Sequence, residues 1–154
     1  MSEAGRAHPG PASVALPRAI ADTIVGQARA EYPNEACGIV TGTGPAAAGG
    51  APLAYEPARN RAASPYRYEI HPEDLYRIHL ATEDDDHVFW AIVHSHVKSP
   101  AVPSPTDVGL ALYPDALYVL VSLVAEQAGP EGEPPLRAWR IVDGVVHEVG
   151  LEIA

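Results

Sequence analysis

The residues best suited to chemistry in this 154-residue sequence lie on one short segment, which reads HSHVKSPAVPSPTD. His94 and His96 are followed by Ser104 and then by Asp107. Two imidazoles and a carboxylate supply three ligands for one divalent metal, and three protein ligands leave zinc a fourth position for water, as in catalytic sites. Bound zinc lowers the pKa of that water from 15.7 to about 7, which yields hydroxide at neutral pH. The segment therefore predicts a zinc-dependent hydrolase with one Zn²⁺ per chain.

The spacing of the two histidines fits a strand that ends at the metal. Residues i and i+2 of a strand point to the same face, so His94 and His96 would project together. Residues 88–93 are apolar, β-branched or aromatic, which is typical of a buried strand. Prolines make the following segment a loop, and Ser104 is a helix N-cap followed by proline. Asp107 then stands at the third helical position, where a strand–loop–helix turn brings its carboxylate back to the histidines.

Two histidines near a strand end can also be ordinary hydrogen-bonded or solvated residues, and H-x-H alone is a weak motif. The longer string, with serine and aspartate at set positions, is much more specific, so a metal site is the favoured interpretation. The remaining histidines have no such spacing and are expected at the surface or in structural positions: His8, His71, His79, His87 and His147.

A zinc-dependent hydrolase also needs a group that takes the proton of the water and delivers it to the leaving amine, commonly Glu or Asp. Glu35 is the best candidate because it lies just before an apolar strand expected over residues 37–42. The alternative is a water-exposed residue of the loop between helix and strand, since only burial would raise its pKa towards the useful range. Cys37 is expected to be a small buried side chain rather than a nucleophile.

Hydrophobic periodicity and chain breakers predict the elements that position these residues. Helices are expected over residues 17–31, 71–83 and 105–112. Strands are expected over residues 37–42, 52–58, 66–70, 88–96, 116–124, 136–142 and 145–149, the last two joined by an Asp-Gly hairpin turn. Mobile loops are expected over residues 43–51 and 126–135. This order predicts an α/β fold, a single domain over residues 17–154 with a mixed, mostly antiparallel sheet flanked by helices, after a flexible N-terminal tail over residues 1–16.

Composition excludes several classes of protein. Ten basic and 20 acidic residues give a formal net charge of −10, which argues against nucleic-acid binding, because nucleic-acid binders present basic patches. The acidic run at residues 83–86 is expected to be a solvated helix end. The single cysteine excludes an intrachain disulfide. No apolar stretch is long enough to predict a membrane span, and a cytoplasmic protein is the default expectation.

Glu35 and the string from His94 to Asp107 together resemble the signature of the JAMM (MPN-plus) zinc metalloprotease family. Further matching segments are E-A-C-G-I-V-T-G starting at Glu35, Asn60, S-P-Y-R-Y at residues 64–68 and P-D-A-L-Y-V-L at residues 114–120. The resemblance extends over roughly residues 17–149 of the chain. It implies the cytidine-deaminase-like α/β fold of the MPN domain.

The resemblance implies a role for each matching residue. The two histidines and the aspartate would bind zinc, and Glu35 would activate the water as general base and then protonate the leaving amine. Ser104 would donate a hydrogen bond to the oxyanion of the tetrahedral intermediate, a contact worth ~3 kcal/mol. Asn60 would contact substrate, whereas Ser95, on the opposite face of the strand from the ligands, would be structural.

The chain departs from many family members at one position, where Val97, followed by Lys98, replaces the proline after the second histidine. The departure changes the stiffness of the loop and not the ligand set, so it bears on substrate preference. Some family members lack the metal ligands and serve as non-catalytic MPN scaffolds, and the complete ligand set argues against that interpretation here. A nucleoside deaminase-like zinc enzyme would need a Cys-x-x-Cys pair, which a chain with one cysteine does not have.

The resemblance also implies a class of substrate. JAMM enzymes cut amide bonds after the C-terminal Gly-Gly of ubiquitin-like proteins, whose extended tail would bind beside the sheet. This short chain most resembles small prokaryotic members linked to sulfur-carrier proteins, in which the enzyme releases cysteine from the Gly-Gly end of the carrier. The alternatives are trimming of extra C-terminal residues and isopeptide deconjugation of ubiquitin-like proteins. Apolar strand edges would support a homodimer.

Overall fold

The computed structural model describes residues 10–124 and 134–154, which form a seven-stranded sheet with three α-helices. In chain order the elements are β1 (Ser13–Leu16), α1 (Arg18–Glu31), β2 (Cys37–Gly42), β3 (Pro52–Ala58), α2 (Pro72–Asp84), β4 (Val88–His96), α3 (Pro105–Gly109), β5 (Leu117–Ser122), β6 (Leu136–Val142) and β7 (Val145–Ile153). A short 3-10 turn at Ala46–Ala48 lies between β2 and β3.

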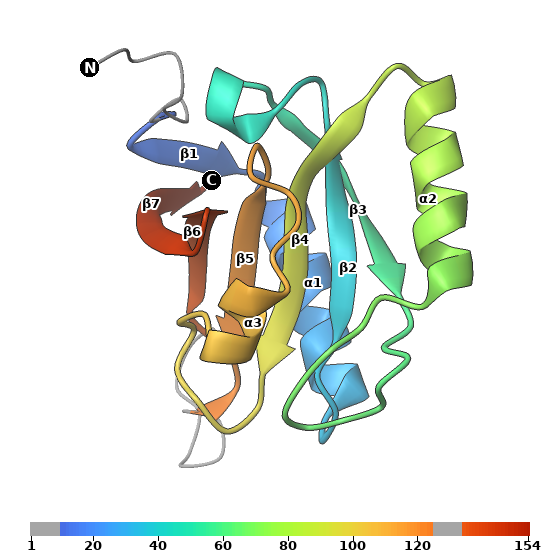
Figure 1. Cartoon of the computed structure of the whole chain (residues 1–154), viewed down its shortest axis with the longest axis vertical. Coiled ribbons are helices and arrows are strands. Elements are labelled where there is room, and N and C mark those ends of the chain that lie inside the picture. The colour runs from blue at the N-terminus through green and yellow to red at the C-terminus, as the bar shows by residue number, and fades with distance from the viewer. Residues whose placement is uncertain (1–9, 125–133) are drawn as a thin grey trace.

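The strand order β1-β7-β6-β5-β4-β2-β3 makes a mixed sheet. The pairs β1/β7 and β4/β5 are parallel, and the other four neighbouring pairs are antiparallel. The parallel strands β4 and β5 are joined by a crossover that contains α3 (Figure 1). The predicted single sheet of mixed, mostly antiparallel strands is therefore confirmed.

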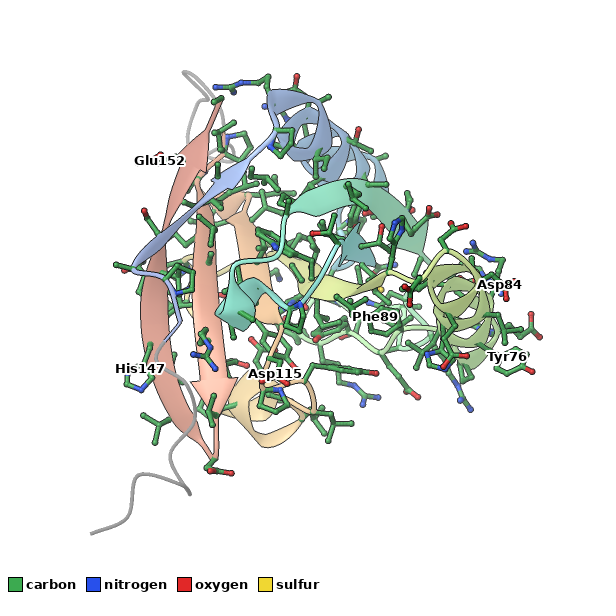
Figure 2. The ribbon with its side chains drawn as sticks, turned by 90° about the horizontal axis from the view of Figure 1, so that it is seen from above. Tyr76, Asp84, Phe89, Asp115, His147 and Glu152 are labelled. Carbon is green, nitrogen blue, oxygen red and sulfur yellow. The ribbon has the colours of Figure 1, made fainter. Side chains whose placement is uncertain are left out.

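Helices cover both faces of this sheet: α1 lies on one face, and α2 and α3 lie on the other (Figures 1 and 2). Each face has its own apolar core, one containing Ile24 of α1 and the other Ile78 of α2. Along β4, Val93 belongs to the first core and Ile92 to the second. Burial on both faces explains why this strand is an unbroken apolar run. None of the helices in the described segments combines the length and apolarity that a membrane crossing needs.

The predicted flexible tail over residues 1–16 is wrong for its last four residues, while residues 1–9 lie outside the described part of the chain. Ser13–Leu16 form β1, which pairs in parallel with β7 at the other end of the sequence. Leu16 is fully buried. The same pairing extends β7 to Ile153, beyond the predicted end at residue 149. Four residues carry too little pattern to predict a strand, and only the partner strand decides that they form one.

The strand predicted over residues 66–70 does not form, and only Ile70 makes an isolated bridge, to Asn60. Tyr68 instead stacks on the ring of His94, with ring centroids 4.2 Å apart and an interplanar angle of 20°. The alternation of residue types in this segment therefore reflects packing against the end of β4 rather than pairing in the sheet.

Two further boundaries differ from prediction. The helix expected over residues 105–112 ends at Gly109, after five residues. The loop over residues 43–51 was expected to be mobile, but it contains the 3-10 turn, in which Ala46 and Ala47 are buried. The indole Nε1 of Trp90 donates to the carbonyl of Gly50 at 2.7 Å, which attaches this loop to β4. The loop expected over residues 126–135 lies almost entirely outside the described residues.

Candidate metal centre

Three elements meet where β4 ends. β2 runs antiparallel to β4 and begins with Cys37 opposite His94, so the residues just before β2 lie beside the last residues of β4. The loop after His96 leads into α3, which lies in front of the same end of the sheet (Figure 1). Ser104 and Asp107 form a capping box at the start of α3, which satisfies exposed backbone donors of the first turn. The strand end, the start of β2 and the start of α3 thus bring their side chains to one place.

His94, His96 and Asp107 converge there as the sequence predicted. The two Nε2 atoms lie 3.2 Å apart, and Asp107 Oδ2 lies 3.2 Å from Nε2 of His94 and 3.0 Å from Nε2 of His96. All three residues are almost fully buried. Among the described residues they form a group of side chains that could hold a metal ion.

The triangle of ligand atoms fits a small tetrahedral cation. Zinc holds nitrogen and oxygen ligands at about 2.0–2.1 Å, so two tetrahedral ligands lie about 3.3 Å apart. The observed separations of 3.0–3.2 Å are close to that value. Nitrogen and carboxylate ligands also suit zinc chemically. The residues present therefore fit the metal that the family signature implies.

Hydrogen bonds prepare His96 for this role. Its Nδ1 lies 2.8 Å from the carbonyl of Pro100 and 3.0 Å from Ser99 Oγ. With Nδ1–H donated to the carbonyl, loss of the Nε2 proton that faces Asp107 would leave the lone pair of Nε2 free for a metal. The loop after β4 thus orients the imidazole that the strand presents.

The charges of the cluster also match those of metal ligands. Burial lowers the pKa of His94, which keeps its imidazole neutral. Burial alone would raise the pKa of Asp107, but hydrogen bonds from both imidazoles hold it well below its usual range. For His96, burial acts to lower the pKa, while the hydrogen bonds to Asp107 and Pro100 raise it above its ordinary value. An ionised carboxylate beside a neutral imidazole is the state that binds a divalent cation.

Glu35 lies beside this cluster and is 4% exposed, so the water-exposed alternative is wrong. Its backbone N–H donates to the carbonyl of Ser64 at 2.9 Å. The next residue, Ala36, is held by Ser95: its N–H donates to Ser95 Oγ at 2.8 Å, and its carbonyl accepts from the Ser95 N–H at 3.0 Å. Ser95 therefore has the structural role expected of it, because it fixes the backbone next to Glu35.

The carboxyl of Glu35 itself has few partners. Its Oε1 is buried and has no hydrogen-bond partner among the described residues. Burial raises its pKa to about 8, with His96 lowering it and Asp107 raising it. A carboxyl with this pKa can both hold and release a proton near neutral pH, which suits an acid–base group.

The hydroxyl of Ser104 caps the start of α3 and keeps its own proton available for donation. Its Oγ accepts from the Asp107 N–H at 3.1 Å, and its own N–H donates to Asp107 Oδ2 at 2.8 Å. Since the hydroxyl oxygen acts as acceptor in the cap, its O–H remains able to donate elsewhere. The cap therefore places a hydroxyl donor next to a metal ligand.

Asn60 holds backbone segments together. Its Nδ2 donates to the carbonyls of Glu35 at 3.0 Å and Arg67 at 3.1 Å. Its Oδ1 accepts from the N–H groups of Ala62 and Glu69, both at 3.0 Å. Two donations and two acceptances use the full capacity of an amide side chain. A contact between Asn60 and substrate stays a prediction, whereas its support of the Glu35 backbone is a role that sequence reasoning missed.

Of the hollows among the described residues, two on the α2 and α3 side of the sheet bear on the cluster. A cavity of about 460 Å³ opens beside the cluster, lined by Asp107, Tyr68, Arg67 and Leu110 among others. A larger one of about 760 Å³ lies between α2 and residues 112–116 and contains none of the predicted site residues. Figure 2 shows Phe89, which lines the larger cavity, between the sheet and α2, and Tyr76 on the outer side of that helix. The smaller cavity is therefore the one that a substrate of the cluster would enter.

The fold and the cluster define a protein of the JAB/MPN class, and comparison with known proteins agrees. The family of prokaryotic homologs of the JAB domain matches residues 17–142. The chain belongs to this family.

Two kinds of enzyme are among the proteins similar to this chain. The chain is 38% identical to the CysO-cysteine peptidase of Mycobacterium tuberculosis over 129 residues, 84% of this chain and 83% of the relative. It is 34% identical to the desampylase of Haloferax volcanii over 125 residues, 77% of this chain and 81% of the relative. The crystal structure of a JAB1/MPN domain protein from Archaeoglobus fulgidus, 17% identical, has the same fold with a TM-score of 0.57 over 92% of this chain and 99% of that chain.

Proposed function

We propose that this protein is a zinc metallopeptidase that hydrolyses the amide bond after the C-terminal Gly-Gly of a ubiquitin-like sulfur-carrier protein and releases the cysteine joined to it. The observation that carries the proposal is the convergence of three side chains that could ligate a metal beside the buried carboxyl of Glu35. Similarity to the CysO-cysteine peptidase over most of both chains supports this choice of substrate.

His94, His96 and Asp107 would hold the zinc. When bound, zinc supplies a Lewis acid for the scissile carbonyl and lowers the pKa of bound water to about 7. The neutral imidazole of His94 and the ionised carboxylate of Asp107 need no proton release before they ligate.

Glu35 takes the proton of the attacking water on its carboxyl and then gives it to the nitrogen of the leaving cysteine. The unpartnered Oε1 is the atom suited to this transfer, because no protein hydrogen bond among the described residues competes for it. Burial raises the pKa of this carboxyl to about 8, and the positive charge of bound zinc would lower it, so that near neutral pH the carboxyl could both accept the proton of the water and release it to the amine. The bonds from Ser64 and Asn60 to its backbone hold the carboxyl in place during both steps.

Ser104 donates its hydroxyl proton to the oxyanion that forms as the carbonyl carbon becomes tetrahedral. Its cap bond to the Asp107 N–H fixes the oxygen while leaving the proton free. A fixed donor of this kind is worth ~3 kcal/mol of transition-state stabilisation. The Gly-Gly tail of the carrier enters the cavity beside Asp107. Glycine residues lack side chains, so the backbone of the tail can approach the cluster closely.

Two alternatives act on the same bond type. Similarity to a desampylase favours isopeptide deconjugation of ubiquitin-like proteins as the second candidate, and trimming of extra residues beyond Gly-Gly uses the same residues. A non-catalytic MPN scaffold is disfavoured by the complete ligand set. A cytoplasmic location, a homodimer and a lack of nucleic-acid binding stay predictions from the sequence.

The test is the intact mass of a ubiquitin-like carrier ending Gly-Gly-Cys after incubation with the zinc-loaded protein, with and without chelator. The proposal expects a loss of one cysteine residue that the chelator prevents. A zinc-loaded protein that leaves this carrier intact but cleaves an isopeptide-linked conjugate would move the function to deconjugation. A protein that binds no zinc and cleaves neither would be a scaffold.

A further inference from the structure

Lys98 is the one lysine of a chain with a formal net charge of −10, and it lies two residues after a candidate metal ligand. Its ammonium donates to the hydroxyl of Tyr66 at 3.4 Å and lies 5.2 Å from the centre of the Tyr66 ring. No ion pair formed within the described part of the chain involves Lys98. The positive charge beside the candidate metal centre is therefore not neutralised by a protein carboxylate in that part of the chain.

The backbone that carries Lys98 is well fixed although the side chain is exposed. Val97 before it is 1% exposed. Ser99 after it accepts a hydrogen bond on its carbonyl from Ser122 Oγ at 2.7 Å and places its own Oγ 3.0 Å from Nδ1 of His96. The backbone of Lys98 is thus held in place beside the candidate site.

Two hydrogen bonds link Tyr66 to Glu35 through Ser64. Its N–H donates to Ser64 Oγ at 3.0 Å, and the carbonyl of Ser64 accepts from the Glu35 N–H at 2.9 Å. The proposed mechanism makes Glu35 the donor of a proton to the leaving amine, so the released residue lies next to this carboxyl. The cavity for the carrier tail lies beside Asp107 and α3 and is also lined by Arg67 and Tyr68, so Tyr66 is adjacent in the chain to the edge of that cavity.

We propose that the Lys98 ammonium, together with the Tyr66 hydroxyl, binds the free α-carboxylate of the amino acid that is released. The inference rests on the proposed peptidase function and names what the site selects. In a carrier that ends with one extra amino acid, the α-carboxylate is attached to the carbon bearing the leaving nitrogen. In an isopeptide the leaving nitrogen belongs to a lysine side chain and has no carboxylate at that position.

The chemistry of the pair suits a carboxylate. The ammonium has three donors, and the Tyr66 hydroxyl accepts one of them while its own proton stays free to donate. Both donors therefore can turn to one anion, and hydrogen bonds to a charged acceptor are stronger than neutral ones. The acidic balance of the rest of the chain repels an anion, so a local cation is needed where the carboxylate must lie.

The experiment compares two substrates that differ only in charge: a carrier ending Gly-Gly-Cys with a free carboxylate, and the same carrier ending in the carboxamide. Cleavage of each by the full-length, zinc-loaded protein is followed by intact mass over a range of substrate concentrations. The wild type is expected to prefer the acid by about tenfold in kcat/KM, mostly through KM, because a contact made before and during reaction changes binding rather than kcat. The preference should shrink as salt is added, since the contact is exposed.

Three variants test which side chains produce the preference for the acid over the carboxamide. Lys98→Met keeps the apolar length of the side chain and should remove the preference by slowing cleavage of the acid alone. Lys98→Arg should retain most of it, and Tyr66→Phe should lower it by about threefold. Arg61→Met is the matched control: it removes one exposed cation that is already paired with Glu69 at 3.6 Å, so the preference should persist.

Each outcome decides between the two proposals. Equal cleavage of acid and amide by the wild type, or an unchanged preference in Lys98→Met, overturns the role of Lys98 while leaving the peptidase function in place. An equal loss of preference in Arg61→Met would show that net charge, and not Lys98, produces it, and overturns the inference too. Failure of the wild type to cleave either substrate overturns both proposals.

Discussion

Two polar clusters meet at Glu35, and they differ in how completely their polar atoms are hydrogen-bonded. Around Asn60, all four hydrogen bonds of the side chain go to backbone groups, and the amide is fully satisfied. In the ligand cluster of His94, His96 and Asp107, the side chains mainly face one another. There, His94 Nδ1 and the neighbouring Glu35 Oε1 are buried without partners among the described residues.

We infer that the difference separates residues that hold the candidate site from residues that would act in it. A buried polar atom without a partner costs about 1–3 kcal/mol of stability, and proteins retain such atoms mostly at functional sites. The Asn60 cluster offers no free atom to a ligand and instead fixes the chain that carries Glu35. Four predictions test this division, beginning with the largest expected effect.

Loss of a ligand should have the largest effect. His96→Ala is expected to reduce bound zinc to below about one tenth of the wild-type level, because losing even a hydrogen-bond partner of a metal ligand commonly costs about 10–100-fold in metal affinity, and losing the ligand costs more. Hydrolysis should fall to the level of the chelated protein. Elemental analysis of purified protein measures the zinc. The control is His79→Ala, which removes a half-exposed histidine paired with Glu83 on α2 and should keep full zinc; full occupancy in His96→Ala would refute the ligand assignment.

Loss of the proton carrier should stop turnover but spare the metal. Glu35→Gln preserves the size of the side chain and removes its acid–base function, so kcat should fall by about 100-fold or more at unchanged zinc content. Steady-state cleavage of the Gly-Gly-Cys carrier measures it. Glu31→Gln, at the exposed end of α1, is the matched control. Equal activity of Glu35→Gln and wild type would remove Glu35 from the mechanism.

Loss of the supporting amide should affect stability first. Asn60→Ala leaves backbone groups of four residues without their partner, which should lower the free energy of unfolding by about 2 kcal/mol. Zinc should remain bound, and kcat should fall by roughly tenfold, since the backbone of Glu35 becomes less fixed. Denaturant unfolding and steady-state kinetics measure the two effects, with Asn34→Ala as control. A raised KM at unchanged stability would instead make Asn60 a substrate contact.

The smallest effect is a pH dependence of the metal-free protein. The pKa of Glu35 is raised by burial to about 8 in the folded state, so between its ordinary value and pH 8 the folded protein holds a proton that the unfolded chain releases. Folding then takes up a proton, and the free energy of unfolding falls as pH rises, by at most about 1.4 kcal/mol per pH unit.

Glu35→Gln lacks this titration. Its melting temperature relative to wild type should therefore rise from pH 5 to pH 8 when both proteins are kept in chelator. A difference in melting temperature that stays constant over this range would mean that the carboxyl is not held protonated by burial.

Much of the candidate metal centre could be predicted from sequence because its geometry is local. Alternation along a strand places His94 and His96 on one face, and a serine cap followed by proline starts the helix that carries Asp107. The buried apolar run of β4 and the hairpin of β6 and β7 depend on patterns a few residues long, and both elements formed as expected.

The tertiary structure alone decided what surrounds those ligands. β1 forms because it pairs with β7 from the other end of the chain. Tyr68 stacks on His94 instead of pairing in the sheet. The burial of Glu35, its bond to Ser64 and the contact of Lys98 with Tyr66 join segments about 30 residues apart. The sequence by itself determined which side chains could bind a metal, since neighbours along a chain have fixed relative geometry. It left open whether Glu35 is buried beside them, and it did not indicate which cation lies at the rim, because those contacts depend on sheet register and loop packing over long separations.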